Sequence, residues 1–205
     1  MIECIQGEGG VLALDEGFIK GLYEFSREND ILLIIDEVQT GNGRTGELYA
    51  YQNFGINPDI VSTAKGLGGG LPIGACMLSE KVQNVLGFGD HGSTYGGNPV
   101  CCAGALSILE RIDAKLLSEV KKKSKYIFDT LSGCDGIESV SGMGLMIGIL
   151  PSKRSASEIV KSCMEKGVLC LTAKNKVRLL PALNIPFDIL KEAIDIIKTE
   201  CEKGE

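Results

Sequence analysis

Hydrophobic residues follow two patterns along this chain: short continuous runs and longer stretches with helical spacing. Residues 31–35 and 59–64 form short runs rich in branched side chains, which are typical of buried strands. Helical spacing occurs at 15–28, where Asp15 stands at the start. Because strand and helix patterns alternate, we expect a largely parallel sheet with crossover helices.

The first half of the chain is expected to hold four strands and two helices. The strands are expected at 1–6, 31–36, 59–64 and 73–79, and the helices at 15–28 and about 99–112. Asn98 and Pro99 mark the start of the second helix, since asparagine caps helices and proline fits the first turn.

The pattern changes after residue 111. A basic amphipathic helix is expected at 114–132, followed by short strands and two further helices. The strands are expected near 137–150, 168–172 and 176–180, and the helices near 155–166 and 187–202. This second half has the pattern of a small α+β domain, so we predict domains at 1–115 and 116–205.

Composition narrows the class of protein. The chain has 205 residues, 44% hydrophobic and 23% charged, with a net charge of −6. An acidic chain is a poor partner for nucleic acid or an anionic membrane surface, and no apolar run reaches the roughly 18 residues of a membrane span. We expect neither nucleic acid nor a membrane as a partner.

The cysteines and the single histidine limit metal chemistry. None of the eight cysteines forms a Cys-x-x-Cys pair, and one histidine cannot complete a zinc cluster. We therefore expect no metal site, and free thiols in a reducing cytoplasm.

The strongest chemical signal lies where two predicted strands end. Asp36 follows the run 31–35, and Lys65 follows the run 59–64. Ligands of open α/β sheets bind at the carboxyl ends of the strands. An amine nucleophile and a carboxylate are the groups that pyridoxal phosphate requires of a protein. The two residues therefore point to this cofactor.

Two nucleotide-binding interpretations compete with this one. An apolar strand ending in Asp-Glu also resembles a Walker B strand, but the chain contains no Gly-Lys dipeptide for the matching phosphate loop. Residues 41–46 match Gly-x-Gly-x-x-Gly, yet two carboxylates precede them and the following helical stretch is short. We interpret 41–46 as a loop that shapes the mouth of the site.

Five ordered motifs carry a resemblance to a known family. They are the segments 3–10, 36–46, 62–70, 91–99 and 177–181. Together they resemble class III pyridoxal-phosphate aminotransferases over nearly the whole chain. The resemblance implies fold type I of the pyridoxal-phosphate-dependent transferases. Residues 1–115 would be the C-terminal part of its large, mostly parallel domain, and 116–205 its small C-terminal α+β domain.

The resemblance also implies roles at the cofactor. Lys65 would be the Schiff-base lysine and the proton carrier, desolvated so that its amine is reactive. Asp36 would hold the pyridine nitrogen protonated, and Gln39 would bond the phenolic oxygen. Ser93 and Thr94 would reach the cofactor phosphate of a neighbouring subunit, so the resemblance implies a homodimer with a shared site.

Two residues are implied at the substrate. Arg178 would bind a carboxylate of glutamate or 2-oxoglutarate, since arginine suits bidentate contacts with carboxylates. Glu8 would pair with Arg178 when that substrate is absent. Taken alone, an arginine in a strand is also compatible with an ordinary surface position.

The implied reaction is amino transfer between N-acetylornithine and 2-oxoglutarate, in arginine biosynthesis. Ornithine, succinylornithine or 4-aminobutyrate remain alternative amino donors, and a non-catalytic fragment is the alternative from another class. By resemblance, Met1 corresponds to a position midway through the family's large domain. We therefore expect the 205-residue chain alone to be inactive.

Overall fold

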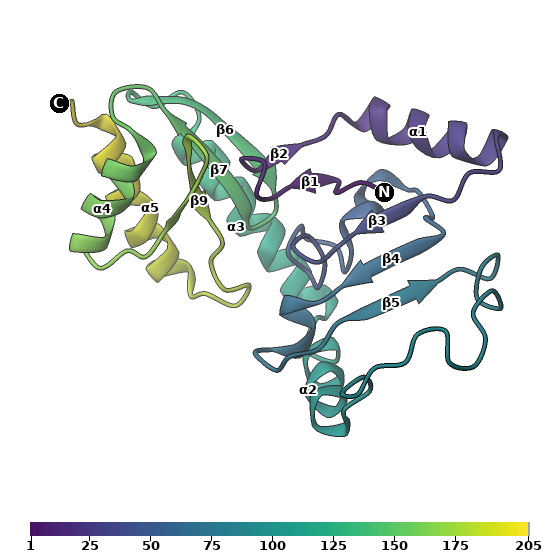
Figure 1. Cartoon of the computed structure of the whole chain (residues 1–205). Coiled ribbons are helices and arrows are strands. Elements are labelled where there is room, and N and C mark those ends of the chain that lie inside the picture. The colour runs from purple at the N-terminus through teal and green to yellow at the C-terminus, as the bar shows by residue number, and fades with distance from the viewer. Residues whose placement is uncertain (205) are drawn as a thin grey trace. The chain divides into compact units, whose positions relative to one another are not determined.

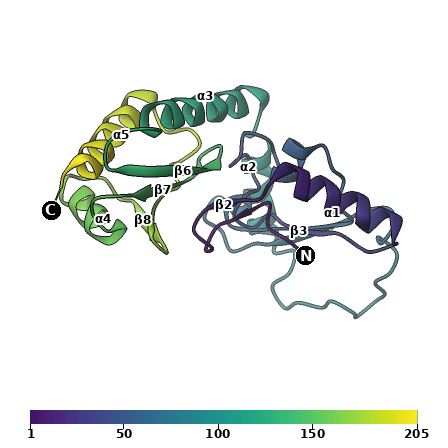
Figure 2. The ribbon, with the colours of Figure 1, turned by 90° about the horizontal axis from the view of Figure 1, so that it is seen from above.

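The computed structural model describes residues 1–204 and divides the chain into two compact units. Unit 1 contains Met1–Cys4, Leu14–Gly43 and Glu47–Ala114. Unit 2 contains Ile5–Ala13, Arg44–Gly46 and the chain from Lys115 onward. Figure 1 shows the helices and strands of both, and β8 is labelled in Figure 2. No helix within residues 1–204 combines the length and the apolar character needed to cross a membrane.

Unit 1 is built on a three-stranded sheet in the order β3-β4-β5 (Figure 1). Strand β3 (Ile34–Asp36) is parallel to β4 (Ile60–Thr63), and β4 is antiparallel to β5 (Ala75–Leu78). Ile2 extends the parallel part through a single bridge to Ile35. Within the described residues, the sheet is thus parallel on one side of β4 and antiparallel on the other.

Two helices of unit 1 begin where their capping residues predict. Helix α1 (Glu16–Glu28) begins after Asp15, whose side chain accepts from the Phe18 amide at 2.9 Å. Helix α2 (Pro99–Leu109) begins after Asn98, whose side chain accepts from two amides of the first turn. It ends three residues earlier than expected.

The strands of the first half differ from expectation in two places. The predicted strand 1–6 is not continuous, because β1 (Ile5–Gln6) turns back and pairs antiparallel with β2 (Leu12–Ala13). The predicted strand 31–36 begins only at Ile34, and Ile31 and Leu32 are exposed. Between β3 and β4 the chain forms a short 3₁₀ helix, η1 (Ala50–Phe54), in keeping with the short helical stretch expected after residues 41–46.

Unit 2 is a four-stranded antiparallel sheet with three helices. The strand order is β6-β7-β9-β8. The strands are β6 (Ile137–Met143), β7 (Met146–Pro151), β8 (Leu171–Ala173) and β9 (Lys176–Leu179), and the helices are α3 (Ala114–Leu131), α4 (Ala156–Glu165) and α5 (Phe187–Glu202). Figure 2 shows α3 and α5 along one face of the sheet. Side chains from all three helices and the sheet form one buried apolar cluster.

The β1–β2 hairpin belongs to unit 2 although it comes first in the sequence. Ile5 and Val11 are buried in a second apolar cluster with Met146 and Ala173. The Ser141 hydroxyl also donates to the Val11 carbonyl at 2.8 Å. Burial of these side chains explains why the chain enters unit 2 early and then returns to unit 1.

Candidate functional site

Asp36 and Lys65 follow neighbouring strands of unit 1. Strands β3 and β4 are parallel and in register, with Asp36 opposite Ser62, and Lys65 comes shortly after the end of β4. The Glu37 amide donates to the Ser62 carbonyl at 2.8 Å and continues the pairing by one residue. The structure therefore confirms that an acid and a lysine follow the carboxyl ends of two adjacent parallel strands.

The Asp36 carboxylate is oriented by its own turn. One of its oxygens, Oδ1, accepts a hydrogen bond from the Val38 amide at 2.9 Å, and the residue is half-buried. This bond limits rotation of the side chain while leaving lone pairs for another donor. Gln39 lies in the same turn and is also half-buried.

Glu37 is a structural residue for which the sequence predicted no role. Its side chain is buried and accepts from the Thr40 hydroxyl at 2.5 Å and from the Tyr51 amide at 2.9 Å. Burial raises the pKa of Glu37 above its ordinary value, against the effect of these bonds. Glu37 thereby ties the turn after β3 to η1. Successive residues of a strand point to opposite faces of the sheet, so the alternation from Asp36 to Glu37 was the sequence signal that could have placed Glu37 on the buried face.

Lys65 has an unusual backbone and an exposed side chain. Its φ is +47°, in the left-handed region that residues other than glycine rarely adopt, and it opens a short 3₁₀ helix, η2 (Lys65–Gly68). The expectation that Lys65 is desolvated is wrong for this chain, because the residue lies on the surface. Left-handed backbone at a non-glycine residue often marks a functional position.

Residues 41–46 form turns rather than a dinucleotide-binding strand–turn–helix. The chain that follows reaches only η1, so the context that such a motif needs is absent from the described residues. Arg44, within unit 2, donates to the carbonyls of Leu145 at 3.1 Å and Pro181 at 2.5 Å. Burial lowers the pKa of Arg44 to about 10. A role of this loop in shaping the site stays a prediction.

Ser93 and Thr94 lie in an exposed segment of unit 1 that leads to α2. Their hydroxyls thus precede a helix N-terminus, where backbone amides favour an anion such as phosphate. Tyr95, beside them, is also exposed.

Arg178 and Glu8 form the ion pair expected from the sequence. The Arg178 guanidinium donates to Glu8 Oε1 at 2.7 Å, although 170 positions separate the residues. The Arg178 side chain is 11% exposed and that of Glu8 is 76% exposed. Arg178 Nε is buried without a hydrogen-bond partner among residues 1–204. The contact is confirmed, whereas substrate binding by the pair stays a prediction.

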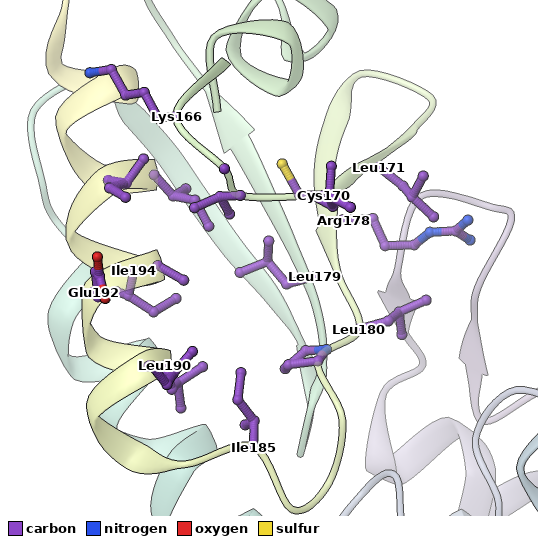
Figure 3. Close-up of a pocket in the computed structure, with 18 residues that line it drawn as sticks. Lys166, Cys170, Leu171, Arg178, Leu179, Leu180, Ile185, Leu190, Glu192 and Ile194 are labelled. Atoms are coloured by element: carbon purple, nitrogen blue, oxygen red, sulfur yellow. The ribbon is translucent and has the colours of Figure 1, made fainter. Parts of the chain in front are cut away.

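Unit 2 also contains a cavity of about 400 Å³ between α5 and the segment around β9. Its lining is mainly apolar, and Figure 3 shows Leu179, Leu190 and Ile194 around it. The guanidinium of Arg178 points away from the centre of this cavity in Figure 3, in keeping with its bond to Glu8.

The predicted site residues are thus distributed over both units. Unit 1 carries the five expected at the cofactor: Asp36, Gln39, Lys65, Ser93 and Thr94. Unit 2 carries the two expected at the substrate, Glu8 and Arg178. No group of three His, Cys, Asp or Glu side chains in residues 1–204 is arranged to hold a metal ion.

Comparison with known proteins gives one consistent family. The model of the family "Aminotransferase class-III" matches residues 1–200. The acetylornithine aminotransferase of Haemophilus ducreyi is 46% identical over 198 residues, and that of Methanothermobacter thermautotrophicus is 44% identical over 203 residues. These alignments cover 96% of this chain but only 50% and 52% of the two relatives. The chain therefore spans about half the length of the curated relatives it matches.

Solved structures agree with the sequence comparison. An ornithine aminotransferase from Toxoplasma gondii superposes with a TM-score of 0.91 at 33% identity, covering 97% of this chain and 50% of that one. An acetylornithine aminotransferase from Elizabethkingia anophelis superposes with a TM-score of 0.88 at 35% identity, covering 97% and 52%. The fold is that of part of a pyridoxal-phosphate-dependent aminotransferase.

Proposed function

Because the chain belongs to the class-III aminotransferase family, whose members depend on pyridoxal phosphate, we propose that it is part of an enzyme that moves an amino group between N-acetylornithine and 2-oxoglutarate. The observation that carries the proposal is the placement of Asp36 and Lys65 after the ends of two paired parallel strands. Arginine biosynthesis is the corresponding pathway.

The residues of unit 1 fit this cofactor chemically. An amine, a carboxylate and the Gln39 amide follow the ends of β3 and β4. Two hydroxyls, on Ser93 and Thr94, precede the N-terminus of α2. Pyridoxal phosphate offers an aldehyde, a pyridine nitrogen, a phenolic oxygen and a phosphate, and each has a matching group in this set.

Each of these residues has a defined task in the proposal. When bound, pyridoxal phosphate supplies an electron sink that stabilises negative charge on an amino acid. Lys65 holds the cofactor through its Nζ and moves a proton with the same atom. Asp36, oriented by the Val38 amide, keeps a nearby ring nitrogen protonated. Gln39 donates to the phenolic oxygen.

Arg178 and Glu8 are proposed to select the substrate. The guanidinium binds a carboxylate of glutamate or 2-oxoglutarate in place of Glu8, whose exposed side chain can move away at little cost. When an amino donor without that carboxylate is bound, Glu8 keeps Arg178 neutralised. The pair thus allows one site to accept two unlike substrates.

The assembly and location follow the same proposal. We place Ser93 and Thr94 at the cofactor phosphate of a second subunit, so that a homodimer completes the site.

We place the protein in the cytoplasm, supported by eight cysteines that are all free. We also propose that 1–115 is the C-terminal part of the cofactor-binding domain, and that 116–205 is the small domain.

Ornithine is the second candidate for the amino donor. Solved ornithine aminotransferases superpose on this chain as well as acetylornithine aminotransferases do. The curated relatives named acetylornithine aminotransferase, at 41–46% identity, favour the acetylated donor. A comparison of kcat/KM for the two donors in the protein that contains this chain separates these candidates.

The assignment of Lys65 can be tested by chemical trapping. The protein that contains this chain is incubated with pyridoxal phosphate and reduced with borohydride. The labelled lysine is then identified by peptide mass spectrometry. A pyridoxyl group at Lys65 is expected, and Lys65→Arg should abolish saturable labelling while Lys20→Arg, a change at an exposed lysine of α1, should not. Saturable labelling of any other lysine would overturn the assignment.

A further inference from the structure

Asn42 is a buried residue that contacts the chain immediately before Lys65. Its exposed fraction is 6%, and its Nδ2 group donates to Thr63 Oγ1 at 3.0 Å and to the Ala64 carbonyl at 3.3 Å. All these residues belong to unit 1. The contacts join the turn after β3 to the end of β4.

The orientation of the Asn42 amide follows from these partners. The Ala64 carbonyl can only accept a hydrogen bond, so the group that faces it must be the NH₂. The Oδ1 atom is then buried and lacks a hydrogen-bond partner among residues 1–204. An unpaired buried oxygen destabilises a fold. What Asn42 contributes here is therefore its donor group.

The segment that Asn42 holds is under backbone strain. Lys65 has a φ of +47°, and this conformation is unfavourable for a residue with a Cβ. Thr63 is itself fixed, since it is buried at the end of β4 and pairs there with Ala75 of β5. Asn42 also packs closely beneath Gly66, where an added Cβ would lie 3.4 Å from the Asn42 Cβ.

We propose that Asn42 is a positioning residue, whose amide holds the peptide before Lys65 so that the lysine keeps its strained backbone and presents its amine in one direction. The inference rests on the proposed function of Lys65 and extends it. The free energy that the two hydrogen bonds contribute is similar to the cost of the left-handed backbone at Lys65, so the bonds can offset that cost. Without them, the backbone at Lys65 relaxes and the amine samples other directions.

Asn42→Gly is the decisive variant. Asn42 itself has a φ of +56°, which glycine adopts without cost, so the variant keeps the turn and removes the side-chain bonds together with the side chain's packing against Gly66. Asn29→Gly is the matched control. Asn29 also donates from Nδ2 to a backbone carbonyl, that of Phe25 at 2.9 Å, but at the end of α1.

The first measurement needs no cofactor. The Leu67 amide donates to the same Ala64 carbonyl at 3.0 Å, so its hydrogen exchange reports on the segment that Asn42 holds. We expect exchange of Leu67 to become about tenfold faster in Asn42→Gly, with α1 unchanged. Unchanged or slower hydrogen exchange at Leu67 would overturn the proposal, because Asn42 would then stabilise only the turn after β3 in which it lies.

The second measurement separates positioning from binding. Lys65 is labelled at a series of pyridoxal phosphate concentrations and trapped with borohydride. In Asn42→Gly we expect the maximal labelling rate to fall about tenfold, while the concentration for half-maximal labelling changes less than about twofold. Asn29→Gly should match the parent chain. A normal maximal rate in Asn42→Gly would contradict the proposal.

The two measurements also distinguish the inference from the proposed function. If the parent protein shows no saturable labelling at Lys65, the proposed function fails, and the exchange of Leu67 still decides the role of Asn42. If the parent is labelled and both measurements are normal in Asn42→Gly, the proposed function stands and the role of Asn42 is rejected.

Discussion

Arg178 and Glu8 form a contact that combines a nearly buried guanidinium with an exposed carboxylate. The exposed partner has water available as an alternative, whereas the arginine does not. Displacement of Glu8 by a substrate carboxylate therefore keeps the buried charge paired. This asymmetry is the physical basis for expecting Arg178 to be the fixed element of the pair and Glu8 the movable one.

Arg178→Ala should lower kcat/KM for 2-oxoglutarate about 100-fold, because a charge-assisted hydrogen bond contributes about 2–3 kcal/mol. The acetylated amino donor should lose less, since Glu8 masks the arginine in that half-reaction. Steady-state kinetics of both half-reactions in the protein that contains this chain provide the measurement. Lys176→Ala is the control, because Lys176 lies on the same face of β9. Equal losses for both substrates would count against a switch between the two partners.

Helices α4 and α5 are joined by a buried carboxylate, that of Glu200 on α5. Lys166, at the end of α4, donates to Glu200 Oε1, and Lys203 donates to the same oxygen at 2.6 Å. Arg154, just before α4, lies 3.4 Å from Oε2. Burial alone would raise the pKa of Glu200, but the bonds from Lys166 and Lys203 outweigh it and bring the pKa from 4.5 to about 2.

This arrangement predicts how the stability of unit 2 depends on pH. The carboxyl group takes up a proton near pH 4.5 in the unfolded chain but only near pH 2 in the folded chain. Its contribution is therefore complete above about pH 5 and is lost as the pH falls toward about 2. Glu200→Gln should lower the free energy of unfolding at pH 7 by roughly 2 kcal/mol and weaken its dependence on pH over that acid range.

Urea unfolding at several pH values, followed by amide signals of α4 and α5, measures this effect. Glu16→Gln is the control, because it removes an ion pair with Lys20 whose side chains are both exposed, and it should change little. If the parent chain and Glu200→Gln lost stability equally on acidification, the buried carboxylate would not be responsible.

The elements themselves were predicted with uneven success. Helices α1 and α2 begin where Asp15 and Asn98 cap them, since capping depends on neighbours within one turn. The hairpin β1–β2 was not expected, because two-residue strands leave almost no hydrophobic period to detect. Its register depends instead on the apolar side chains that it buries in unit 2.

At the scale of the whole molecule, unit 1 exposes much apolar surface. Helix α2 is apolar on nearly all sides, yet Val100 and Leu106 are exposed, as are Phe88 and Tyr95 in the segment before it. Helices that are apolar all round are normally buried, and large exposed apolar patches mark interaction surfaces. Ser93 and Thr94 lie in the same exposed segment.

We therefore expect the 205-residue chain alone to associate and to lack transamination activity. An exposed Lys65 and an exposed Ser93–Thr94 segment cannot hold a cofactor within the fraction of an ångström that turnover requires. The purified chain is assayed with N-acetylornithine and 2-oxoglutarate, and its size is followed by light scattering against concentration. Ordinary steady-state rates from a monodisperse monomer would prove this expectation wrong.

The sequence by itself determined which residues stand at the strand ends and where the helices begin. Asp36, Lys65, Asp15 and Asn98 could be located because these signals depend on residue types within a few positions of each other. The family motifs likewise led to Arg178 and its partner Glu8.

Only the tertiary structure decided which of these groups are buried and what they touch. It buried Glu37 beside a half-buried Asp36, left Lys65 exposed, and placed Asn42 against the Ala64 carbonyl. It also assigned Ile5–Ala13 and Arg44–Gly46 to the unit that the second half of the chain forms. Burial and long-range contacts depend on how distant segments pair and pack, and local sequence patterns carry little information about that pairing.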